Sequence, residues 1–106
     1  MPKYLIEASY TADGVRGIQS GGGSARRDAV SNALKGAGGS VESFHFGFGD
    51  SDAYVIVEAP DNVTAAAVTL AVNATGAVHA KTIVLLTPEE VDAAAKQSVS
   101  YTPPGG

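Results

Sequence analysis

Four segments of the sequence alternate apolar and polar side chains with a period of two, which is the pattern of half-buried strands. Two longer segments instead repeat apolar residues at helical spacing. We expect strands over residues 3–10, 41–48, 53–58 and 77–86, and helices over residues 24–35 and 62–74. This order, βαββαβ, is that of the split βαβ or ferredoxin-like arrangement. The sequence therefore predicts an α+β domain whose four-stranded antiparallel sheet carries two helices on one face.

Residues with strong local preferences mark the ends of these elements. Ser24 is a suitable N-cap for the first helix, and the glycines at 36, 38 and 39 end it. A short helical turn is expected over residues 15–19. The run Thr87-Pro88-Glu89-Glu90 predicts a short C-terminal helix that fades by residue 97. We expect one domain over residues 1–97 and a disordered tail over residues 98–106.

The charge balance narrows the classes of partner. The chain has seven basic and eleven acidic residues, a formal net charge of −4, and no cysteine. This balance argues against nucleic acid and against an anionic membrane surface as partners. Without cysteine, disulfides and thiolate metal sites are excluded. The sequence has no run of 18 apolar residues and no apolar signal-peptide core, so we expect a cytoplasmic protein.

Several short motifs carry a family resemblance over roughly residues 1–95. They are Pro2-Lys3-Tyr4-Leu5-Ile6, Tyr10-Thr11, Gly23-Ser24-Ala25-Arg26-Arg27, Phe48-Gly49-Asp50-Ser51-Asp52, and Thr82 with Thr87-Pro88-Glu89-Glu90. In these motifs the chain resembles the GYD domain family. The resemblance implies a ferredoxin-like fold akin to dimeric α/β barrel proteins. Proteins of related fold include heme-handling enzymes, cofactor-free monooxygenases and ligand sensors, so the fold does not choose an activity. Ser51 stands where the family motif has Tyr, so any role of that hydroxyl is absent.

The polar face of the predicted sheet holds the candidate catalytic residues. Strand alternation places Glu7, His45, His79 and Lys81 on the face that the helices leave uncovered. A carboxylate and imidazoles are suited to general acid–base catalysis. In the expected strand order the two histidines lie on opposite edges, roughly 14 Å apart at ~4.8 Å per strand, so we predict no metal site within one chain. The alternative interpretation is that these side chains line a subunit interface.

Three tyrosines and one arginine are the candidate ligand-binding residues, together with Lys81. Tyr4, Tyr10 and Tyr54 are placed to flank an apolar pocket, although strand aromatics also serve as core or interface. Arg27 follows a glycine-rich stretch that opens a helix, where an anion can bind, but the same stretch also fits a flexible connector. The acidic residues of the segment 49–52 are explained by hairpin turn chemistry.

These features together predict a small homo-oligomeric domain that binds a small, largely apolar molecule in a regulatory or accessory role. The binding position is expected between the sheet and its helices or a partner copy. No cofactor is expected. One alternative is a cofactor-free monooxygenase or isomerase-type enzyme that uses His45 or His79 as acid or base. Another is a structural or assembly protein.

Overall fold

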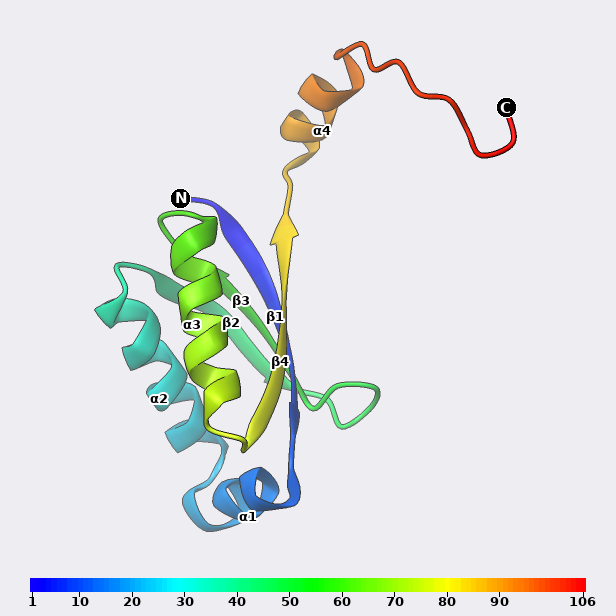
Figure 1. Cartoon of the computed structure of the whole chain (residues 1–106). Helices are drawn as coiled ribbons and strands as arrows, with labels where there is room; N and C mark the ends of the chain where they lie inside the picture. Colours follow the sequence, from blue (N-terminus) through cyan, green and yellow to red (C-terminus); the bar gives the residue numbers. More distant parts are fainter.

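The computed structural model describes all 106 residues and contains four strands and four helices (Figure 1). In chain order the elements are β1 (Lys3–Tyr10), α1 (Ala12–Gly21), α2 (Gly23–Gly36), β2 (Ser40–Phe46), β3 (Ala53–Glu58), α3 (Asn62–Ala74), β4 (Val78–Leu85) and α4 (Pro88–Ala95). The predicted α+β class is confirmed. The period-two segments form the strands, and the two segments with helical spacing form α2 and α3.

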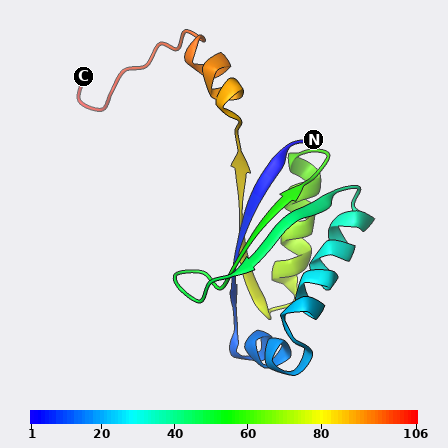
Figure 2. The same cartoon turned by 180° about the vertical axis from the view of Figure 1, so that it is seen from behind.

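The four strands form one antiparallel sheet in the order β2-β3-β1-β4. The first and third strands are therefore central and the second and fourth lie at the edges, as expected. Helices α2 and α3 cover one face of this sheet, and no element covers the other (Figures 1 and 2). We call the uncovered side the open face.

The core lies between the sheet and its two covering helices. Tyr4 of β1, Leu34 of α2 and Val57 of β3 are the largest side chains that are fully buried there. Tyr4 and Val57 belong to the alternate strand residues that point toward the helices, and Leu34 packs against them from α2. Only nine residues of the chain are buried, so much of its apolar surface is still exposed.

Most of the other differences from the expected bounds are single residues, as at both ends of β4, but α1, the start of α2 and the end of β2 differ for reasons of backbone geometry and capping. Helix α1 is ten residues long, not one turn, and it begins earlier than expected because the Thr11 side chain caps its start by accepting from the Gly14 amide. Helix α2 begins at Gly23 and has no side-chain cap, so the N-cap prediction for Ser24 was wrong. Strand β2 ends at Phe46, because Phe48 has a φ of 48°, which a strand does not permit.

The C-terminal segment projects away from the body of the domain (Figures 1 and 2). A capping box between Thr87 and Glu90, with Pro88 in the first turn, starts helix α4 as the sequence predicted. Residues 98–106 contain a turn but no helix or strand. Apolar side chains of this segment, Leu86 and Val91 among them, are exposed.

Candidate functional site

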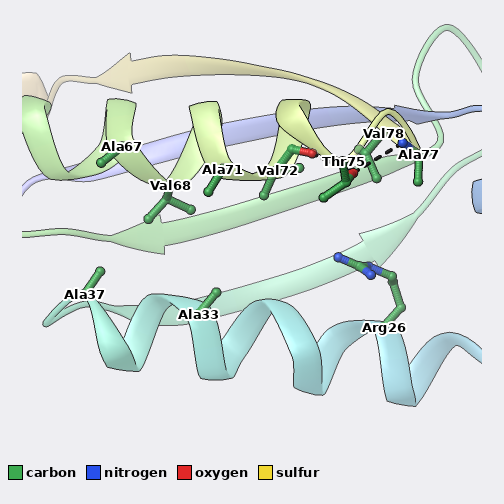
Figure 3. Close-up of a pocket in the computed structure, with 10 residues that line it drawn as sticks. All are labelled: Arg26, Ala33, Ala37, Ala67, Val68, Ala71, Val72, Thr75, Ala77 and Val78. Carbon is green, nitrogen blue, oxygen red and sulfur yellow. Dashed lines mark hydrogen bonds between the residues drawn. The ribbon is translucent and has the colours of Figure 1, made fainter.

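A groove of about 530 Å³ runs between helices α2 and α3 on the covered side of the sheet (Figure 3). Ten residues line it, and eight of them are hydrophobic. They are Arg26, Ala33, Ala37, Ala67, Val68, Ala71, Val72, Thr75, Ala77 and Val78. This volume lies within the range of roughly 300–1,000 Å³ that is typical of small-molecule sites.

Short side chains keep the groove open. Ala33 and Ala37 are one helical turn apart on α2, and Ala67 and Ala71 are one turn apart on α3. The two alanine pairs line the facing sides of these helices (Figure 3). Larger residues at these positions would bring apolar atoms into the space that is now empty. The groove is thus a consequence of residue size on two helices that the sheet holds apart.

Arg26 supplies the only charge in the groove lining and lies at one end of it (Figure 3). It precedes Val30 by four residues and Ala33 by seven, so helical periodicity places it on the apolar face of α2. Its Nε is buried and has no hydrogen-bond partner. No carboxylate lies within ion-pair distance of its guanidinium, whereas Lys3, Arg16 and Arg27 each pair with an acid.

Arg27 was the predicted ligand-binding arginine, and the structure separates it from its neighbour Arg26. Arg27 is exposed, and its guanidinium lies 3.3 Å from the carboxylate of Asp28. It borders a shallow surface recess near Phe44 and Phe46, not the groove. The signal that points to Arg26 was present in the sequence, because its spacing from Val30 and Ala33 matches the helical repeat.

Tyr10 lies beside Arg26 and lines two recesses that adjoin the groove. Burial raises the pKa of its hydroxyl, and the Arg26 guanidinium opposes part of that rise. The Tyr10 amide donates to a carboxylate oxygen of Asp52 at 2.9 Å, which ties the end of β1 to the β2–β3 hairpin. This bond gives Asp52 a structural task in addition to its place in the turn.

The three predicted tyrosines do not share one pocket. Tyr4 is buried in the core, where its hydroxyl donates to Asn62 Oδ1 at 2.6 Å. Tyr54 points to the open face, because it is out of phase with the buried residues Ala53 and Val55 of β3. Of the three, Tyr10 alone lies next to the groove.

The open face carries the four predicted polar residues, and the cross-strand register decides which of them lie opposite one another. Cross-strand register forms the row His45, Tyr54, Glu7 and Lys81 across the sheet, and His79 lies opposite Ser9. His45 and His79 are on opposite edge strands, as predicted. Glu7 makes no hydrogen bond or ion pair with His79 or Lys81, and no group of three His, Asp or Glu side chains is arranged to hold a metal.

A comparison with protein families decides the affiliation of the chain. The model of the GYD domain matches residues 4–95. The chain belongs to the GYD domain family. No curated protein and no solved structure matches it. None of its helices has both the length and the apolar character that crossing a bilayer requires.

The matched region of this GYD domain includes both helices of the groove and all four strands apart from Lys3 at the start of β1. Its hairpin motif at residues 49–52 closes the loop between β2 and β3 through backbone bonds. The Gly47 amide donates to the Asp52 carbonyl, and the Asp52 amide donates to the Ala8 carbonyl, each at 2.8 Å. The motif thereby joins the hairpin to the central strand β1.

Proposed function

We propose that this GYD domain binds a small, largely apolar molecule in the groove between α2 and α3, in a regulatory or accessory role. The groove itself is the observation that carries the proposal. The groove is open to solvent, and exposed apolar grooves on soluble domains commonly mark ligand or interaction sites. Its volume of about 530 Å³ and its hydrophobic walls are those of a small-molecule site.

The groove also has the chemistry of an apolar site. Its Thr75 hydroxyl is already engaged, since it donates to the Val72 carbonyl at 2.8 Å and accepts from the Ala77 amide at 3.2 Å. Apart from Arg26, the lining then presents alkyl groups and few free polar atoms. Burying an apolar ligand there gains roughly 25 cal/mol per Å² of surface removed from water.

A substitution that fills the groove tests this proposal. Ala71→Leu places a larger side chain in the lining, whereas Ala66→Leu adds the same atoms at an exposed position of α3 outside it. Phenylnaphthylamine, an uncharged fluorescent probe, reports binding by its emission. We expect the natural protein and Ala66→Leu to bind it equally, and Ala71→Leu to bind at least about tenfold more weakly, a loss of about 1.4 kcal/mol.

Two results would contradict this proposal. One is a natural protein that does not bind the probe at millimolar concentration. The other is an Ala71→Leu protein that is folded, by circular dichroism and thermal unfolding, and binds as well as Ala66→Leu. In either case the groove is not the site of an apolar ligand.

We further propose that a second copy of the chain covers the open face. An apolar row of Leu5, Ile56 and Ile83 crosses the sheet there, next to the polar row that contains Glu7. The exposed apolar residues of the C-terminal segment offer additional surface to a partner. The element order and the order β2-β3-β1-β4 support a ferredoxin-like arrangement, which would pair in the manner of a dimeric α/β barrel.

A further inference from the structure

The position of Arg26 is unusual for a charged residue. It lies on the face of α2 that otherwise presents Val30, Ala33 and Leu34 to the sheet and the groove. Arg27, one residue later, lies in solvent beside Asp28. Helix α2 thus presents one arginine to water and one to an apolar space. An arginine whose only requirement is contact with water would be expected at an exposed position, such as that of Arg27.

The guanidinium of Arg26 is half-buried and pairs with no carboxylate of the chain. Its Nε is the only buried side-chain nitrogen or oxygen of the chain without a hydrogen-bond partner. Asp13, which borders the adjoining recess, is paired with Arg16, and Asp52 accepts from the Tyr10 amide. Buried polar groups in native proteins are nearly always satisfied, so an exception calls for an explanation.

A ligand with an acidic group would give the terminal nitrogens of this guanidinium the counter-charge that the chain does not supply. The guanidinium presents its donors as a planar fork that matches the two oxygens of a carboxylate. The alkyl-lined walls of the groove begin where this fork ends (Figure 3). One end of the site is therefore suited to an anion, and the rest is suited to a hydrocarbon body.

We propose that the groove binds an amphipathic carboxylic acid, whose carboxylate is held by the Arg26 guanidinium and whose apolar part lies between the alanines of α2 and α3. This inference rests on the proposed function, because it names the ligand class for the same groove. The groove lining holds one cation and no further charged donor. A single carboxylate therefore fits this groove better than a di- or triphosphate does.

A matched pair of ligands tests the inference. Octanoic acid and octanol have the same alkyl length and differ in the anionic group. Each is titrated at neutral pH into the natural protein, Arg26→Gln and Arg27→Gln, and the methyl resonances of the groove alanines give the dissociation constants. We expect the natural protein to bind the acid at least about tenfold more tightly than the alcohol, as a charge-assisted bidentate contact permits. Arg26→Gln should remove that preference, and Arg27→Gln should retain it.

The outcomes separate this inference from the proposed function. If the natural protein binds acid and alcohol equally, the carboxylate inference is overturned and the apolar site remains. If it binds neither ligand, both proposals are overturned. The comparison of the two ligands on the natural protein needs no variant, so it holds even if Arg26→Gln fails to fold. A preference for the acid that persists in folded Arg26→Gln would place the carboxylate elsewhere and contradict the role of Arg26.

Discussion

Tyr10 and Arg26 meet at the end of the groove, where burial and charge act on the tyrosine hydroxyl in opposite directions. Burial is the larger influence, so the pKa of Tyr10 in the folded protein is above its ordinary value of 10.0. The folded chain consequently holds this proton to a higher pH than the unfolded chain. The resulting stabilisation is fully present below pH 10.0 and disappears as the pH rises through the folded pKa.

The substitution Tyr10→Phe tests this residue-scale effect. We expect the free energy of unfolding of the natural protein to fall more steeply above about pH 10 than that of Tyr10→Phe, because the variant has no hydroxyl to titrate. Urea denaturation at a series of alkaline pH values measures both. The raised pKa of Lys3, caused by Glu42, is present in both proteins and cancels in the comparison. Parallel pH profiles would show that burial does not hold the Tyr10 proton.

The two histidines define a second residue-scale prediction. His45 and His79 lie on the open face, on the other side of the sheet from the groove. We expect His45→Ala and His79→Ala to bind phenylnaphthylamine and octanoic acid as the natural protein does, within about twofold of its affinity. Fluorescence titration measures this. A large loss of affinity in either folded variant would move the site to the open face, where the acid–base enzyme alternative would place it.

At the scale of elements, α2 is attached to the sheet through one dominant side chain. Leu34 is 1% exposed and packs in the same core cluster as Tyr4 and Val57, whereas Leu70 on α3 is 72% exposed. Truncating a buried leucine removes apolar contacts and leaves a cavity. The same truncation on an exposed helix surface removes little.

We therefore expect Leu34→Ala to reduce the free energy of unfolding by about 2–5 kcal/mol. Leu70→Ala is the matched control and should change it by about 0.5 kcal/mol or less. Chemical denaturation with circular dichroism measures both variants. Equal effects of the two substitutions would be inconsistent with α2 being anchored through Leu34.

The elements also show what the sequence could predict and what it could not. The bounds of β3 and α3 match the expectation, because their side-chain periods are regular and turn residues flank them. The predicted end of β2 at residue 48 was wrong, because a phenylalanine in the sequence gives no sign that its backbone adopts a positive φ, as Phe48 does. The helical phase of Arg26 was readable from the sequence. The groove was not, since it depends on the distance between two helices that are remote in the chain.

At the scale of the whole molecule, the layered architecture is one-sided. The helices cover one face of the sheet, while Ile83 and its neighbours in the apolar row lie on the face that they leave open (Figures 1 and 2). A lysine in this row would have to be buried if a second copy covered it, and burying an unpaired charge is costly. The assembly state should therefore respond to a charge placed there.

The variant Ile83→Lys tests the proposed homo-oligomer. We expect it to weaken self-association at least about tenfold relative to the natural protein, by about 1.4 kcal/mol. Val63→Lys, at an exposed position of α3 in the helical layer, should have no effect. Light scattering during size-exclusion chromatography at several concentrations measures the mass of each. If the natural protein is monomeric at micromolar concentration, the proposal that a second copy covers the open face is contradicted.

The most direct test of the ligand site is a measurement of where octanoic acid lies on the protein. Intermolecular nuclear Overhauser effects between its alkyl protons and assigned methyl groups report contacts of a few ångströms. We predict contacts to Ala33, Ala67 and Ala71 and none to the open-face residues Ile56 and Ile83. Contacts confined to Ile56 and Ile83, with none to the groove alanines, would contradict the proposal that the groove is the ligand site.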